Sequence, residues 1–146
     1  MRSWSVVALV CFGLTASAIG RADEALDQLV KRADAAPEHQ KAALYTEIAG
    51  RQLQTADALY NSGHTEEARA AIANVVTYSE KAAEASAHAA SRLKQTEIAL
   101  RKMAAKLRDI QRGLSFEDQK PVEEAANRLE KLRTELLARM FGKGDK

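Results

Sequence analysis

The sequence predicts an all-α fold of antiparallel helical hairpins, packed like a coiled coil around one long central helix. Three observations lead to this prediction. Glycine and proline are scarce and fall at intervals that would separate helices. No segment alternates apolar and polar residues as a half-buried strand does. The chain is also rich in Ala, Glu, Leu, Lys, Arg and Gln, which are strong helix formers.

The N-terminal segment 1–18 is a predicted signal peptide rather than part of the domain. Arg2 gives it a positive start, residues 6–14 form a short apolar run, and small residues precede Ile19. We expect cleavage after Ala18, or alternatively after Ala22. An uncleaved anchor is the other alternative, although a membrane span needs about 20 apolar residues. The protein is therefore expected to be exported, and to be periplasmic or secreted.

Loss of this segment changes the composition of the remaining chain. Cleavage after Ala18 removes Arg2, one of 22 basic residues, and leaves the 20 acidic residues in place. It also removes Cys11, the single cysteine, which excludes disulfides, thiolate catalysis and cysteine-bound metals in the mature chain. A net charge near zero, together with export, argues against nucleic acid as a partner.

Two helices are predicted before the long one, at 23–35 and 38–61, within a single helical domain over 23–141. Asp23 suits a helix start, where negative charge meets the helix dipole. Pro37 separates the two helices, and Gly63 is expected to end the second in a left-handed conformation. The apolar face of the first helix is Leu26, Leu29, Val30 and Ala33. The apolar face of the second is Leu44, Tyr45, Ile48, Ala49, Leu53, Ala56, Leu59 and Tyr60.

One continuous helix is predicted over 65–113, capped by Thr65, because no glycine or proline lies between Gly63 and Gly113. It would be about 73 Å long. Apolar or small residues recur in it at spacings of four and three, which predicts coiled-coil packing. These heptad positions are Ala68, Ile72, Val75, Ser79, Ala82, Ser86, Ala89, Leu93, Thr96, Leu100, Met103, Leu107, Ile110 and Leu114. We interpret the small residues of 82–91 as a close-packing segment where the ends of neighbouring helices meet.

The last helix is predicted over 118–141, with Asp118 as its cap and Pro121 in its first turn, followed by a frayed tail at 142–146. Its apolar face is Val122, Ala125, Leu129, Leu132, Leu136 and Met140. Helices 38–61 and 118–141 should each lie antiparallel along one half of the long helix. A rod two helices thick covers the heptad positions poorly, so we expect either a homodimer or a monomer folded back on itself.

Two sets of side chains are candidates for binding. The first set, expected to bury against helix 118–141 or against a protein partner, is Leu93, Leu100, Met103, Leu107 and Ile110. The second lies in the basic stretch 92–112, whose residues Lys94, Arg101, Arg108 and Arg112 share one helix face. They could contact anionic lipid, a cell-wall polymer or an acidic protein. Alternatively they pair with acidic residues of a second subunit or of the last helix: Glu123, Glu124, Glu130 and Glu135. No aromatic residues alternate with these charges, so the stacking surface of single-strand binders is missing.

No catalytic, cofactor or metal pattern is recognised. Glu84 and His88 share a helix face, but the Glu-x-x-His pairs of di-metal bundles do not occur. We interpret His88 as a partly exposed helix histidine. The sequence contains no glycine-rich phosphate loop, no G-x-S-x-G and no H-E-x-x-H. We therefore expect no enzyme activity, no cofactor and no bound metal.

The segment ADALYNSGHTEEARAAIANVV, residues 56–76, resembles a tetratricopeptide-type helical hairpin. Ala56, Gly63, Ala68 and Ile72 match that family's small, turn, alanine and large apolar positions. No proline ends the second helix, and no further copy follows at a spacing of about 34 residues. The resemblance implies a helical hairpin that can present a peptide-binding surface. The whole chain is also similar to small exported all-helical bacterial proteins.

These features favour a non-enzymatic exported protein that acts by protein–protein association, as an adaptor or a structural subunit of the cell envelope. One alternative is a holdase-like periplasmic chaperone, which the near-zero charge disfavours. Another is peripheral attachment to an anionic membrane surface through 92–112. The identity of the protein partner does not follow from the sequence.

Overall fold

The computed structural model describes the backbone of residues 17–142 and the side chains of residues 25–142. Its helices are α1 (Ser17–Ala35), α2 (Glu38–Asn61), α3 (Thr65–His88), α4 (Leu93–Gly113) and α5 (Phe116–Phe141), with a 3₁₀ turn, η1 (Ala90–Arg92), before α4. Residues 17–142 contain no strand, so the predicted all-α class is confirmed. The predicted signal peptide lies almost entirely outside the described residues, as does the predicted tail apart from Gly142.

Two helix boundaries follow from the residues that marked them in the sequence. Pro37 immediately precedes α2, where its fixed φ suits a helix start. Gly63 has a φ of 79°, a left-handed conformation that glycine adopts without a steric penalty. The amide of His64 then donates to the carbonyl of Leu59 at 2.9 Å, which closes the end of α2 as predicted.

The two predicted N-caps are wrong. His64, rather than Thr65, precedes α3, and no side chain caps that helix. α5 starts two residues earlier than predicted, after Ser115. Asp118 therefore lies within the first turn, where its Oδ2 accepts a hydrogen bond from Ser115 Oγ at 2.8 Å.

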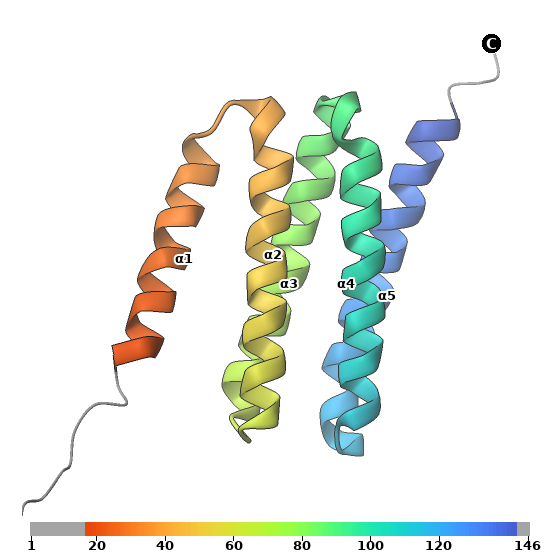
Figure 1. The fold of residues 1–146 in the computed structure, drawn as a ribbon. Helices are drawn as coiled ribbons and strands as arrows, with labels where there is room; N and C mark the ends of the chain where they lie inside the picture. The colour runs from red at the N-terminus through yellow and green to blue at the C-terminus, as the bar shows by residue number, and fades with distance from the viewer. Residues whose placement is uncertain (1–16, 143–146) are drawn as a thin grey trace, which may run out of the picture.

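The prediction of one continuous helix over 65–113 is also wrong. α3 ends at His88, and Ala89 has φ and ψ of −124° and 81°. The chain then turns through η1, so that α4 runs back in the direction opposite to α3 (Figure 1). Neither glycine nor proline marks this break, because tertiary packing overrides the helix propensity of alanine. Folding back allows α5 to cover a face of α3 that α2 leaves open, and Ile72 and Val75 join Leu129 and Leu136 in one core.

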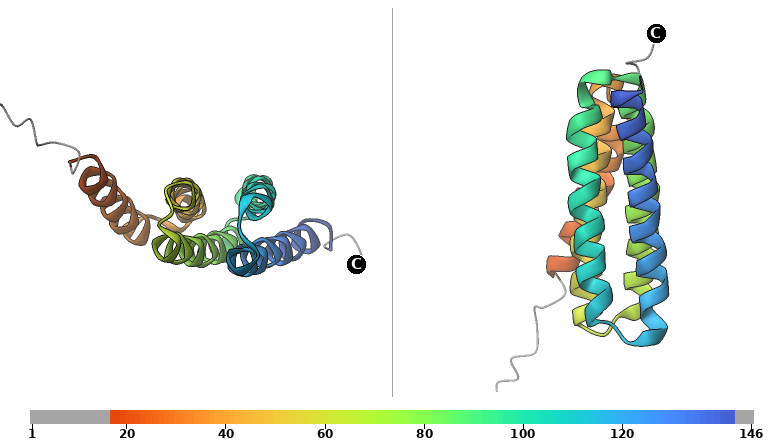
Figure 2. Two further views of the ribbon diagram at one scale, coloured as in Figure 1. Left: turned by 90° about the horizontal axis from the view of Figure 1, so that it is seen from below. Right: turned by 90° about the vertical axis from the view of Figure 1, so that its right-hand side faces the viewer.

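The result is two antiparallel hairpins, α2/α3 and α4/α5, lying side by side. Figure 2 shows α3 and α5 in one layer and α2 and α4 in the other, with α1 at the edge beside α2. All the predicted heptad positions are buried except Ala89 and Leu114, so the pattern holds on both sides of the break. The chain is thus folded back on itself, which buries these positions without a second subunit.

Of the predicted close-packing segment 82–91, only the first half packs closely, because the second half contains the end of α3 and the turn into α4. Ala82, Ala83, Ala85 and Ser86 are all buried. Ala82 and Ala85 belong to a small core with α1 and α2, whereas Ala83 belongs to the main core shared by α2, α3, α4 and α5. Small side chains allow α3 to approach neighbours on several sides here.

Candidate functional site

α4 carries an excess of positive charge. Its basic residues are Lys94, Arg101, Lys102, Lys106, Arg108 and Arg112, and all of them are exposed. Its acidic residues are Asp109 and Glu97, and Glu97 is only 6% exposed. The neighbouring α3 has the opposite balance, with Glu66, Glu67, Glu80 and Glu84 against Arg69 and Lys81. A chain that is nearly neutral as a whole therefore segregates its charge, with the positive part on α4.

The four residues predicted to contact an anion differ in their partners. Arg112 pairs with Asp109 on its own helix, and Arg108 Nη2 donates to Asn127 Oδ1 at 3.3 Å. Lys94 and Arg101 make no ion pair or side-chain hydrogen bond within the described residues.

Lys102, the residue after Arg101, is likewise unpaired within 25–142. Of the acidic residues of α5 that could have neutralised the basic stretch, Glu124 pairs with Lys120 and Glu130 with Arg133, both on α5 itself. Within the described residues, none of the four forms an ion pair with α4, so the prediction of pairing with the last helix is wrong. The charge of Lys94, Arg101 and Lys102 faces solvent.

Two ionic contacts fix α4 against its neighbours. Lys106 Nζ lies 2.6 Å from Asp57 Oδ2 of α2. Glu97 Oε1 accepts a hydrogen bond from Arg133 Nε of α5 at 2.6 Å, and Arg133 also pairs with Glu130 at 3.2 Å. Glu97 and then Glu130 raise the pKa of Arg133, because both carboxylates favour its charged form. The orientation of the basic face of α4 is therefore set by contacts with both layers.

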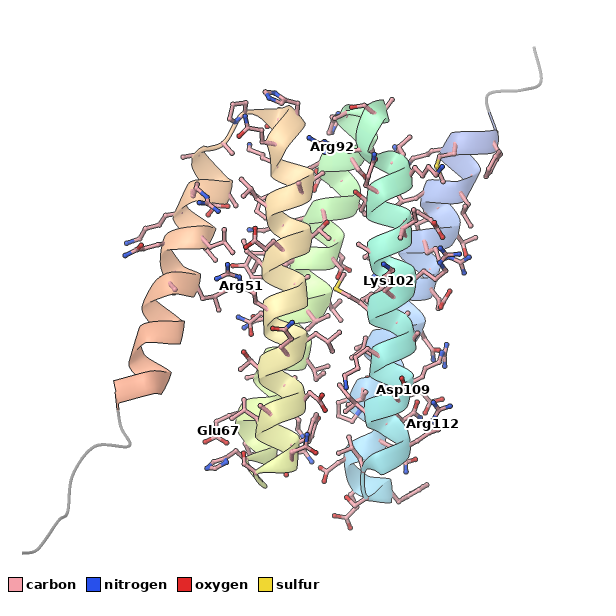
Figure 3. The ribbon with its side chains drawn as sticks, viewed as in Figure 1. Arg51, Glu67, Arg92, Lys102, Asp109 and Arg112 are labelled. Carbon is pink, nitrogen blue, oxygen red and sulfur yellow. The ribbon has the colours of Figure 1, made fainter. Side chains whose placement is uncertain are left out.

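A groove of about 520 Å³ runs between α2 and α4. It is lined by Gly50, Leu53, Gln54, Asp57, Ala58, Asn61, Lys102, Met103 and Lys106. Leu53 and Met103 are largely buried and give it an apolar floor. Lys102 and Lys106 form the wall on the α4 side. Figure 3 shows Lys102 on α4 at the level of Arg51 on α2, with Asp109 and Arg112 further along α4.

Gly50 on the opposite wall is not required by the fold. Gly50 lies within α2 and has no positive φ; among the glycines of the described chain, positive φ occurs at Gly63. A Cβ added at Gly50 would meet nothing within 4 Å. Glycine inside a helix is less stable than alanine by about 0.5–1 kcal/mol. The missing side chain at Gly50 leaves this wall of the groove low.

The five apolar residues predicted for interaction are structural. Leu93, Leu100, Met103, Leu107 and Ile110 are buried in the main core together with α5. Burial against the last helix is thus confirmed. Because they lie inside a single chain, the opposite, basic face is the side of α4 that remains exposed.

Glu84 and His88 line a separate hollow of about 610 Å³ between α2 and α3. Tyr45 is in the same wall, and its hydroxyl donates to Asp34 Oδ1 of α1 at 2.9 Å. Burial, and next the hydrogen bond to Asp34, raise the pKa of Tyr45 to about 12. Residues 25–142 contain no group of three His, Cys, Asp or Glu side chains arranged to hold a metal ion.

Lys81 adds to this cluster, since its Nζ lies 5.3 Å from the ring centroids of both Tyr45 and Tyr78 and 4.0 Å from Asp34 Oδ1. The cluster joins α1, α2 and α3. We interpret it as the attachment of α1 to the α2/α3 hairpin.

Sequence reasoning missed the groove and the residues that line it. The predicted continuous helix over 65–113 would hold the residues of α4 far from α2. Nothing in the sequence therefore brought Lys102 and Gly50 together. The available signal was Gly50 itself, a glycine inside a strongly helical segment.

No protein-family model matches this chain, and no match was found among curated proteins or solved structures. Among the described residues, no helix has an apolar stretch long enough to cross a membrane.

Proposed function

We propose that this protein is a non-enzymatic, exported adaptor or structural subunit of the cell envelope that binds another protein through the face formed by α2 and α4. The observation that carries the proposal is the segregated charge of α4. Lys94, Arg101 and Lys102 are exposed and unpaired within the described chain, while the apolar side of the same helix is buried in the core. Such a one-sided charge favours an oppositely charged partner and speeds its association.

The distribution of apolar side chains disfavours the chaperone alternative. A holdase needs exposed apolar area to bind unfolded chains. Among the described residues, the large apolar side chains with high exposure are Phe116 and Phe141, at 90% and 76%. They lie at opposite ends of α5 and form no common patch.

Crosslinking inside the producing cell tests the proposed function. A tagged full-length chain would be expressed at its natural level, crosslinked, purified and identified by mass spectrometry. We expect one dominant protein partner. A broad spread of unfolded exported proteins would instead support the chaperone alternative, and the absence of any protein adduct would reject association.

The intact mass of the protein isolated from cells tests export. We expect a chain that starts at Ile19, or at Asp23 if cleavage follows Ala22. Recovery of the uncleaved chain from the cytoplasm would reject the exported part of the proposal.

A further inference from the structure

We propose that the groove between α2 and α4 is the binding site for an acidic segment of a protein partner. This inference rests on the proposed function and deepens it, because it names the place and the chemistry of the contact. The partner's backbone would lie against Gly50, and its carboxylates would pair with Lys102 and with the unpaired basic residues near it on α4.

The shape of the groove supports a peptide-like occupant. Its floor is apolar, formed by Leu53 and Met103, and polar or charged side chains surround that floor. An apolar centre with a polar rim is the usual anatomy of a protein-binding surface. The flat surface of a membrane would contact the protruding side chains and would not reach the floor.

Gly50 is an independent observation that points to an occupant. Packing within the chain leaves room for a larger side chain at this position, and alanine would make α2 more stable. A glycine that the fold does not need, placed on the wall of a groove, permits another backbone to approach closely.

The charge identifies the chemistry of the occupant. Lys102 lines the groove without an ion pair among the described residues, and Asp57, the acidic residue of the lining, is already paired with Lys106. Lys94, Arg101 and Arg108, at seven-residue spacing, lie outside the groove lining on the adjoining exposed face of α4 and add positive charge near the groove. A segment rich in glutamate or aspartate, with occasional apolar residues for the floor, complements this arrangement.

Fluorescence anisotropy with synthetic peptides tests the site on the full chain. The probe is a fluorescein-labelled peptide of glutamate and leucine, compared with the same peptide carrying glutamine in place of glutamate. We expect the acidic peptide to bind, with an affinity that falls as salt rises, and the glutamine peptide to bind about tenfold more weakly. Failure of the acidic peptide to bind overturns the proposal, as does equal binding of the two peptides.

Matched variants locate the contact. Lys102→Glu should weaken acidic-peptide binding about tenfold. Lys131→Glu makes the same change in net charge on α5, at an exposed residue without an ion pair in the described chain, and should leave binding within about twofold. Equal losses in the two variants would show attraction to the overall charge and would overturn the site.

Gly50→Ala tests the close approach separately from charge. We expect it to weaken peptide binding severalfold, while Gly113→Ala, the same change in open space at the end of α4, leaves binding unchanged. Unaltered binding by Gly50→Ala overturns the groove as the site. Circular dichroism of each variant confirms that the fold is retained.

Two further results separate this inference from the proposed function. If crosslinking in cells captures one partner and the Lys102→Glu and Gly50→Ala variants capture it equally well, the groove is wrong but protein association stands. If the full chain binds vesicles of anionic lipid and not the acidic peptide, the basic face serves a membrane surface, and the acidic-segment proposal is overturned.

Discussion

Two glycines of α2 and its following turn show how one residue type can have opposite effects on stability. Gly63 occupies a left-handed conformation that a side chain would strain, whereas Gly50 lies in ordinary helix with space around it. Gly63 therefore serves the fold. Gly50 lowers the stability of the fold, which is why it is informative about function.

Substituting the two glycines separately tests this distinction. We expect Gly63→Ala to lower the free energy of unfolding by about 1–2 kcal/mol, because an alanine in the left-handed region is strained. Gly50→Ala should raise it by about 0.5–1 kcal/mol. Urea denaturation measures both. A destabilised Gly50→Ala variant would show that the position is constrained by packing rather than left open.

Neighbouring residues on α4 offer a second matched pair. Leu100 is fully buried, and Leu100→Asp would place an unpaired carboxylate in the core, at a cost on the order of 3–5 kcal/mol. Arg101→Asp adds the same carboxylate on the exposed face and should change stability by only about 0.5 kcal/mol. Thermal melting distinguishes the two. Equal melting temperatures would contradict the assignment of the buried face.

Among the elements, α1 stands apart because it is attached at one edge. Its buried residues Leu29 and Ala33 belong to the smaller core with α2 and α3, separate from the main core. The polar part of the attachment is Tyr45, which donates to Asp34 of α1, with Lys81 beside both. This contact depends on the Tyr45 hydroxyl keeping its proton.

The attachment should therefore weaken at alkaline pH. The pKa of Tyr45 is about 12 in the folded chain against 10.0 for a free tyrosine, so the folded state favours the protonated form. Its stabilising contribution is complete below about pH 10 and is lost as pH rises toward 12. We expect the melting temperature to fall more steeply over this range in the wild type than in Tyr45→Phe. Tyr60 and Tyr78 also have raised pKa values, so the melting temperature of Tyr45→Phe should still fall, but less steeply. Identical profiles would show that Tyr45 does not control the attachment.

The positions where the helices begin and end show what local sequence can predict. Pro37 and Gly63 act through their own φ preferences, so the boundaries of α2 were predictable. The break at Ala89 has no such local cause. It results from the burial of one face of α3 by α5, a contact between residues far apart in the chain.

The candidate site shows the same division. That Lys94, Arg101 and Arg108 share an exposed face of a helix follows from their spacing and was predictable. That Lys102 faces Gly50 across a groove depends on the position of α4 beside α2. This position is a consequence of the unpredicted break.

For the whole molecule, the break at Ala89 decides between two shapes. A continuous helix would give an extended rod with the two hairpins end to end. The break instead places them side by side, and only this arrangement creates the layer of α2 and α4 with its groove (Figure 2). The proposed function therefore depends on the folded-back shape.

A pair of distances measured in solution tests this shape directly. Glu67 and Arg112 lie at the same end of the molecule in Figure 3, and both are exposed. In a continuous helix, spin labels at these positions would be about 68 Å apart. In the folded-back chain they should be on the order of 20 Å apart, a separation of two helix spacings. Labels at Glu67 and Arg92 provide the control, since both shapes keep α3 between them and place the labels about 38 Å apart. A long first distance with an unchanged control would reject the side-by-side arrangement, and with it the groove on which the acidic partner is proposed to bind.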